Sequence, residues 1–219
     1  TAVIAVASGQ GMQQICYDFG AAAVIGGGQT MNPSTGDFLE MIGKLPNQTI
    51  VLLPNNKNIL LSAQQAAKEA IGKTVRVVPS ISVPQGVAAL CEYNNFTPEH
   101  DLSTIADAMK ANLASVILQI TTATRSIDFD GIEVRAGQRI GLIDDVLVAA
   151  DDDAFALAEK LLHRASAARH ELVTIYYGEG VSEGEARLLV DHLSGHFPKL
   201  GYEIVNGGQA LYPYIIGLE

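Results

Sequence analysis

The sequence has 219 residues, of which 48% are hydrophobic and 17% are charged, and its formal net charge is −10. This composition excludes an intrinsically disordered chain, because disorder requires low hydrophobicity and high charge. The negative charge argues against nucleic acid and anionic membranes as main partners. No apolar run approaches the roughly 18 residues of a membrane span, and no signal-peptide pattern is present.

The charge divides the sequence into two halves with different surfaces. Residues 1–125 have a net charge of −1, whereas residues 126–219 have a net charge of −9. We therefore expect a nearly neutral subdomain over residues 1–125 and an acidic one over residues 126–219. The sequence begins at Thr1 rather than at a methionine, and we expect it to be a piece of a longer protein.

The first half alternates strand-like and helical patterns. Short apolar strands are expected over residues 3–7, 22–25, 50–53 and 75–78, and apolar residues at helical spacing follow each one. Ser34 and Asp37 form a capping signature before the second of these helices. A further helix follows, with Leu102, Ile105 and Met109 on one face. Repeated strand–helix units predict an α/β fold, with a parallel sheet flanked by helices.

The second half predicts a mixed sheet with helices. Strands are expected over residues 116–122, 172–177, 202–205 and 212–218, with helices over 153–168 and after the cap formed by Ser182 and Glu185. Asp130-Gly131 and Asp144-Asp145 indicate tight turns between short strands. The acidic run over 128–133 has the spacing of a carboxylate metal cluster, but its alternation and Asp-Gly turn favour a hairpin.

The cysteines and histidines do not form a complete set of metal ligands in the sequence. Cys16 and Cys91 lie in apolar surroundings without CxxC spacing, which predicts a buried pair of thiols in a reducing cytoplasm. His192 and His196 are four residues apart on one helix face and could share a metal ion. No third ligand is evident in the sequence, so we expect no metal site.

The connections in the first half point to one edge of the predicted sheet. Helix-to-strand links are short, whereas the strand-to-helix links over residues 8–11, 26–35, 54–58 and 79–85 are long and polar. All strand-to-helix links of an open parallel sheet lie at its carboxyl edge, where ligands bind. We therefore expect this edge to be the functional surface.

The residues of these links favour an anionic ligand. The glycines permit close approach of a partner, the amides supply donors and acceptors, and Ser34 and Thr35 stand at a helix N-terminus that favours an anion. Lys57 is the sole charged residue of the four links, so a phosphate or carboxylate is the expected ligand. Asn58 is equally well explained as a helix cap. The candidate binding residues are Gly27, Gly28, Gln29, Thr30, Asn32, Ser34, Thr35, Asn55, Asn56, Lys57, Asn58, Pro84 and Gln85.

Familiar catalytic and nucleotide-binding signatures are missing from the sequence. It has no GxxxxGK[ST] phosphate loop and no GxSxG elbow, and Gly9-Gln10-Gly11 lacks the third glycine of a dinucleotide fingerprint. Spacing nominates no nucleophile–base pair. We therefore name no catalytic residue and no cofactor-binding residue, and we expect a binding surface rather than a catalytic centre.

Five motifs nevertheless resemble a known family. They are the segments 27–35 (GGQTMNPST), 53–58 (LPNNKN), 83–86 (VPQG), 174–179 (TIYYGE) and 207–214 (GGQALYPY). In this order they resemble the C-terminal region of the dihydroxyacetone-kinase-like FakA/YloV family, the ATP-binding component of bacterial fatty acid kinase. The resemblance covers essentially the whole chain.

The resemblance implies a multi-domain cytoplasmic protein with a DegV-like arrangement of two α/β subdomains in this region. It implies that ATP and magnesium are held on an N-terminal DhaL-like domain, whose aspartate motif this chain lacks, and that the chain alone is inactive. It also implies that this region engages a fatty-acid-binding partner of the DegV/FakB type, which presents an acyl carboxylate for phosphorylation.

Two other functions stay open beside the partner-docking module. The polar edge would also suit a small-molecule site for a phosphorylated or carboxylated metabolite, and a region that holds a homodimer together is the other alternative. Dihydroxyacetone kinases proper bind their substrate covalently on a histidine. None of the four polar links contains a histidine, so that chemistry is not expected here.

Overall fold

The computed structural model describes residues 1–27, 32–113 and 116–218. The chain divides into two compact units, Thr1–Ser115 and Val116–Glu219. The sequence placed the division after residue 125, but the strand over residues 116–122 belongs to the sheet of the second unit. None of the helices in the described part of the chain combines the length and apolar character needed to cross a bilayer.

The first unit is built on a parallel sheet. In the described residues it has four strands in the order β2-β1-β3-β4, and every neighbouring pair is parallel. The strands are β1 (Ala2–Ala7), β2 (Ala23–Gly26), β3 (Thr49–Leu53) and β4 (Thr74–Val77). All six residues of β1 are buried, as expected for a central strand covered on both faces.

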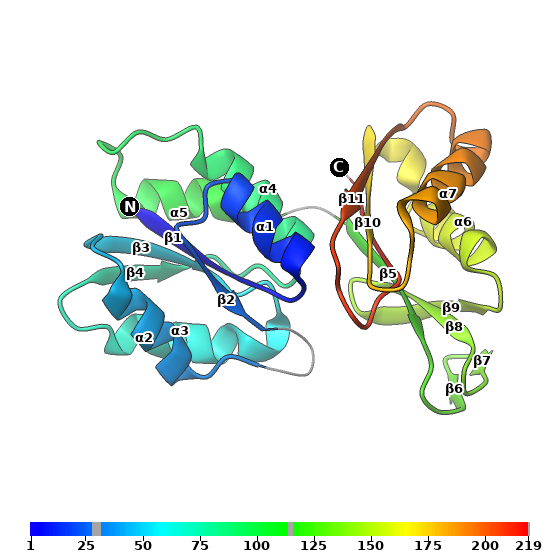
Figure 1. The fold of residues 1–219 in the computed structure, drawn as a ribbon, viewed down its shortest axis with the longest axis horizontal. Helices are drawn as coiled ribbons and strands as arrows, with labels where there is room; N and C mark the ends of the chain where they lie inside the picture. The colour runs from blue at the N-terminus through cyan, green and yellow to red at the C-terminus, as the bar shows by residue number, and fades with distance from the viewer. Residues whose placement is uncertain (28–31, 114–115, 219) are drawn as a thin grey trace. The chain divides into compact units, whose positions relative to one another are not determined.

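Helices cover both faces of this sheet (Figure 1). The helices α2 (Thr35–Lys44) and α3 (Leu60–Glu69) pack on one face, around a core that contains Ile4, Val6, Phe38 and Leu52. The helices α1 (Gln10–Asp18), α4 (Val83–Tyr93) and α5 (Leu102–Ala111) lie on the other face. A short 3-10 helix, η1 (Lys57–Ile59), leads from β3 into α3.

The second unit is built on a mixed sheet. Its six described strands have the order β11-β10-β12-β5-β8-β9, and only β10 and β11 run parallel. The strands are β5 (Val116–Thr122), β8 (Arg139–Ile143), β9 (Val146–Asp151), β10 (Leu172–Tyr177), β11 (Gly201–Asn206) and β12 (Tyr214–Leu218). A separate hairpin joins β6 (Ile127–Phe129) to β7 (Ile132–Val134).

The helices α6 (Ala154–Arg164) and α7 (Glu183–His196) cover one face of the mixed sheet (Figure 1). Their apolar sides pack on Leu118, Ile120, Ile175 and Ile216 from three neighbouring strands. A short 3-10 helix, η2 (Ala167–Arg169), follows α6. The fold class expected from the sequence is therefore confirmed, with a parallel sheet in one unit and a mixed sheet in the other.

Two predicted turns are confirmed by their backbone angles. Asp130 and Gly131 have φ values of 51° and 78° in the loop between β6 and β7. Asp144 and Asp145 have φ values of 48° and 66° between β8 and β9. Positive φ at both positions of a two-residue loop is the type I′ geometry, which matches the twist of the flanking strands. The segment 128–133 is thus a hairpin, as predicted.

The prediction that both cysteines are buried is confirmed for Cys16 and wrong for Cys91. Cys16 is buried in α1, and its burial raises the pKa of the thiol to about 12. Cys91 is exposed, although its neighbour Leu90 is fully buried. One residue along a helix corresponds to a rotation of about 100°, which takes Cys91 away from the core that Leu90 enters. The apolar neighbours of Cys91 in the sequence therefore do not predict its burial.

Two helices begin with the reciprocal cap that the sequence indicated. The Ser34 hydroxyl accepts a hydrogen bond from the Asp37 main-chain N–H at 3.2 Å, and the Ser34 N–H donates to Asp37 at 2.7 Å. Ser182 and Glu185 repeat this arrangement at the start of α7, at 3.2 and 2.9 Å. Two hydrogen bonds from Ser182 hold the pKa of Glu185 below its ordinary value. The bond from the main-chain N–H contributes most, and the bond from the hydroxyl comes second.

This cap predicts a pH-dependent contribution to stability. Because the folded-state pKa of Glu185 is lowered, its stabilising effect is present above the ordinary carboxyl pKa and is lost as the pH falls through the lowered value. We expect Glu185→Gln to be less stable than the wild type near neutral pH and to converge with it in acid. Urea unfolding of both proteins over a pH series measures this difference. Ser182→Ala also loses the bond from the Glu185 N–H, so its deficit should remain in acid. A Glu185→Gln deficit that stays constant with pH would contradict the assignment.

Candidate functional site

The carboxyl edge of the first sheet has its topological switch point between β1 and β3. The chain passes from β1 to β2 on one side and reaches β3 and β4 on the other, as the strand order β2-β1-β3-β4 requires. Ligands of open α/β sheets bind in the crevice outside the strand ends at such a point. A ligand site is therefore expected at the segments that follow β1 and β3.

Asn55 bridges this switch point. It follows β3, and its side-chain amide donates a hydrogen bond of 2.9 Å to the main-chain carbonyl of Val6 in β1. Asn55 is only 7% exposed and has a φ of 54°, the left-handed region that asparagine tolerates better than most residues. Its Oδ1 is buried and has no hydrogen-bond partner among the described residues. Asn55 is one of the predicted binding residues, and in the structure its side-chain amide joins the segment after β3 to β1.

Two serines after β4, which are not among the predicted binding residues, complete this part of the edge. The Ser80 hydroxyl is fully buried and accepts a hydrogen bond from the Asn55 main-chain N–H at 3.1 Å. The Ser82 hydroxyl caps α4 by accepting from the Gln85 N–H at 3.4 Å. The signal for both was present, because alternate serines follow a predicted strand and precede Pro84, which favours a helix start.

Pro84 and Gln85 are buried in the first turn of α4 and serve the local structure. Pro84 stands where the missing N–H of proline is tolerated. The Gln85 side-chain oxygen accepts a hydrogen bond from the Ile81 N–H at 3.0 Å and so closes the link from β4. Gly86 follows, and a Cβ atom built there would lie 2.1 Å from Oδ1 of Asn55. The motif over residues 83–86 thus has its glycine where the Asn55 side chain needs room.

The link after β3 has two buried amides, Asn55 and Asn56, and two exposed polar side chains, Lys57 and Asn58. Asn56 is 7% exposed, and its Oδ1 accepts a hydrogen bond from the Asn58 N–H at 2.8 Å. Asn56 is therefore the cap of η1, and the alternative that Asn58 caps its own helix is wrong. A capping residue precedes the helix that it caps, whereas Asn58 lies inside η1. Lys57 and Asn58 are exposed at the start of η1.

The link after β2 begins and ends within the described residues. The Gly27 N–H donates a hydrogen bond to the Ala7 carbonyl at 3.2 Å, which fastens the link to the end of β1. Asn32 is exposed, and the Thr35 hydroxyl donates to the Ser62 carbonyl at 3.5 Å. Gly28, Gln29 and Thr30, three of the predicted binding residues, lie outside the described residues.

The capping box at α2 weakens the case for an anion at that helix start. The Asp37 carboxylate already accepts hydrogen bonds from the N–H and hydroxyl of Ser34, at 2.7 and 2.8 Å. These bonds, the main-chain one first, hold the pKa of Asp37 below its ordinary value. A negative charge therefore already stands where the helix dipole favours one. Of the candidate residues that the structure describes, Asn32, Ser34, Lys57 and Asn58 have exposed polar side chains, and that of Ser34 is already engaged in the cap.

The two motifs of the second unit contact each other. Gln209 is 4% exposed, and its side-chain amide donates to the carbonyls of Tyr176 and Tyr212, both at 3.0 Å. The Gly178 N–H donates to the Pro213 carbonyl at 2.9 Å, and a Cβ built on Gly178 would lie 2.3 Å from the Tyr212 carbonyl oxygen. The motifs over 174–179 and 207–214 therefore form one folded structure at the end of β10.

The close approach of Gly86 and Asn55 generates a testable prediction. Replacing a helical glycine by alanine ordinarily stabilises a protein by about 1 kcal/mol, and Gly43→Ala in α2, where a Cβ meets nothing within 4 Å, should follow this rule. We expect Gly86→Ala to destabilise the protein instead, because its methyl group displaces the Asn55 side chain. Thermal and urea unfolding of the two variants measures the contrast.

The double variant Asn55→Gly/Gly86→Ala tests the cause. Glycine at position 55 accepts the positive φ and leaves space for the new methyl group. The double variant should therefore lose less stability than the sum of the two single variants. Additive losses would show that the contact between Asn55 and Gly86 is not responsible.

The whole chain is similar in sequence to known proteins. Residues 2–219 match the family of FakA-like C-terminal regions of fatty acid kinase. Protein YloV of Bacillus subtilis (strain 168) is 36% identical over 222 residues, an alignment that covers 99% of this chain and 39% of that protein. The chain thus spans about 39% of the length of the curated relatives that it matches.

Solved structures with the same fold include proteins of the DegV type. DegV, described as a fatty acid binding protein from Bacillus subtilis, has a TM-score of 0.65 at 11% identity and covers 99% of this chain and 98% of its own. The fatty acid kinase (Fak) B3 protein of Streptococcus pneumoniae, loaded with linoleic acid, has a TM-score of 0.58 at 12% identity, with 100% and 99% covered. These likenesses establish a DegV-like fold.

The order of motifs along the sequence, the two α/β units and the match over residues 2–219 agree with one another. The chain belongs to the FakA-like C-terminal family of fatty acid kinase.

Proposed function

We propose that this chain is the C-terminal region of the FakA-type component of a fatty acid kinase, and that it docks a fatty-acid-binding partner of the DegV/FakB type. ATP and magnesium would be held on a separate DhaL-like domain of the same protein, and the reaction would take place in the cytoplasm. The observation that carries this proposal is the family match over residues 2–219.

The chemistry of the described residues supports a docking role rather than a catalytic one. At the carboxyl edge, Asn55, Ser80 and Gln85 are buried and engaged in bonds that fix the local backbone. The Cys16 thiol is buried, and with a pKa of about 12 it is protonated at neutral pH, so it is a poor nucleophile. A rigid edge with exposed Asn32, Lys57 and Asn58 offers a partner a preorganised polar surface.

The proposed docking surface is testable by charge reversal. Lys57 is exposed at the carboxyl edge, whereas Lys68 is exposed in the last turn of α3, which runs away from that edge. We expect Lys57→Glu to slow association with the acyl-loaded partner by roughly tenfold at low salt, because charges at the rim of an interface act mainly on the association rate. Surface plasmon resonance with the full-length FakA-type protein measures this rate.

Lys68→Glu is the matched control, since it changes the net charge equally at the other end of α3. It should leave the association rate close to that of the wild type. Equal rates for all three proteins would remove this edge from the interface. Absence of any binding between the full-length wild-type protein and its partner at high micromolar concentration would overturn the docking proposal itself.

A second candidate is a small-molecule site for a carboxylated or phosphorylated metabolite in this chain. It is favoured by the fold neighbours, whose descriptions name bound linoleic acid and heptadecanoic acid. We expect a fatty acid or an acyl phosphate, if bound, to raise the melting temperature in a concentration-dependent manner, because it binds the folded state. Thermal-shift measurements with these probes and with sugar phosphates test this, and an unchanged melting temperature for all of them would refute it.

A further inference from the structure

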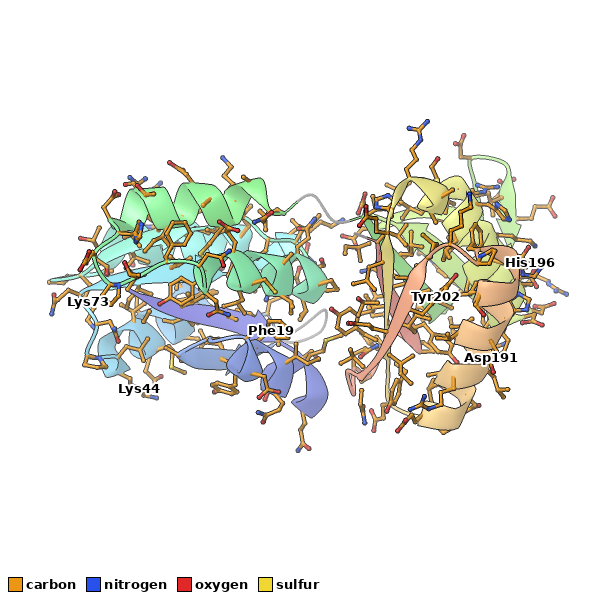
Figure 2. The ribbon with its side chains drawn as sticks, turned by 90° about the horizontal axis from the view of Figure 1, so that it is seen from above. Phe19, Lys44, Lys73, Asp191, His196 and Tyr202 are labelled. Carbon is orange, nitrogen blue, oxygen red and sulfur yellow. The ribbon has the colours of Figure 1, made fainter. Side chains whose placement is uncertain are left out.

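Three side chains of the second unit that commonly bind metals meet at one point. Glu159 lies on α6, and His192 and His196 lie one helical turn apart on α7. One ligand atom from each of the three residues lies within 4.8 Å of the others. The sequence showed the two histidines but no third ligand, because Glu159 is supplied by a different helix. Figure 2 shows His196 at the C-terminal end of α7.

The distances suit a single zinc ion. Zinc binds imidazole nitrogen at 2.0–2.1 Å and carboxylate oxygen at 2.0–2.2 Å, so two ligand atoms of a tetrahedral site lie about 3.4 Å apart. Oε2 of Glu159 is 3.1 Å from Nε2 of His192 and 3.6 Å from Nδ1 of His196. These two separations lie on either side of the tetrahedral value, and the three ligand atoms all lie within 4.8 Å of one another, so an ion must draw them together.

The imidazole of His196 is held by a main-chain contact. Its Nδ1 lies 3.1 Å from the carbonyl oxygen of His192, a group that only accepts hydrogen bonds. A ring nitrogen that donates to a carbonyl cannot ligate a metal at the same time. Binding through Nε2 would keep this bond as an orienting contact of the kind that metal-bound histidines usually make, whereas binding through Nδ1 would release it.

The surroundings hold the side chains in place and favour a cation. The exposed fractions of the Glu159, His192 and His196 side chains are 28, 31 and 46%, so each is partly fixed by its neighbours yet reachable from solvent. The ring of Phe155 lies 5.9 Å from that of His192. Nε2 of His163, also on α6, lies 3.8 Å from the second carboxylate oxygen of Glu159. Residues 126–219 have a net charge of −9.

We propose that Glu159, His192 and His196 form a binding site for one Zn²⁺ ion. Two imidazoles and one carboxylate are a ligand set for zinc and its neighbours in the transition series, whereas magnesium and calcium prefer oxygen ligands alone. Three protein ligands leave a fourth position for water. Because Glu159 comes from α6 and the histidines come from α7, the bound ion links the two helices that cover the mixed sheet.

Zinc titration of the protein free of any histidine tag tests this site. Competition with a chromophoric chelator should give one equivalent of zinc per chain in the wild type. Each of Glu159→Gln and His196→Ala removes one of three ligands, and we expect each to weaken binding by more than the roughly tenfold that loss of an outer-shell contact costs. His170→Ala is the matched control, since this histidine lies in the same unit beside η2 and outside the cluster.

A second measurement separates ligation from a loss of folding. Circular dichroism and melting in a chelator should show both variants folded, and added zinc should raise the melting temperature of the wild type and of His170→Ala but not that of the two ligand variants. The proposal is overturned if the wild type binds no zinc at high micromolar concentration. It is equally overturned if Glu159→Gln and His196→Ala, both folded, bind zinc as tightly as His170→Ala does.

Discussion

The hydrogen bond from the Asn55 amide to the Val6 carbonyl is the interaction on which the carboxyl edge of the first unit depends. It joins the segment after β3 to the end of β1, across the point where the strand order reverses. Asn55 adopts a positive φ to reach this position, and the Ser80 hydroxyl fixes its main-chain N–H. Gly86 lacks a side chain where the amide group passes. Asn55 thus connects, through its main chain and its side chain, to the serine at position 80 and the glycine at position 86.

This arrangement separates two roles within the family motifs. Asn55, Asn56, Pro84 and Gln85 are buried and bonded to nearby backbone or placed in a helix turn, so their side chains build the edge rather than present a surface. Exposed polar groups at Asn32, Lys57 and Asn58 stand on that scaffold. In the second unit, Gln209 and Gly178 likewise join two motifs into one structure. A motif that identifies a family therefore need not mark residues that touch a ligand.

The sequence predicted local structure well and the meeting of distant segments poorly. The Asp-Gly and Asp-Asp turns and both serine caps are set by interactions within a few residues, so their pattern could be seen directly. The bridge from Asn55 to Val6 spans 49 residues, and the pair of Glu159 with His192 spans 33. Nothing in a single sequence specifies which helix faces another, so these contacts needed the fold. Cys91 shows the same limit, because its exposure depends on the helix face and not on its apolar neighbours.

The place of β12 in the second unit has a consequence for biosynthesis. This strand is the last of the described strands to be made, yet it lies between β10 and β5 and pairs with both. A ribosome must therefore translate through residue 218 before the two halves of the sheet can be joined. Until then β5 and β10 each present an unpaired edge, the feature through which nascent chains associate wrongly. A chain that ends before β12 would therefore keep both of these strand edges unpaired.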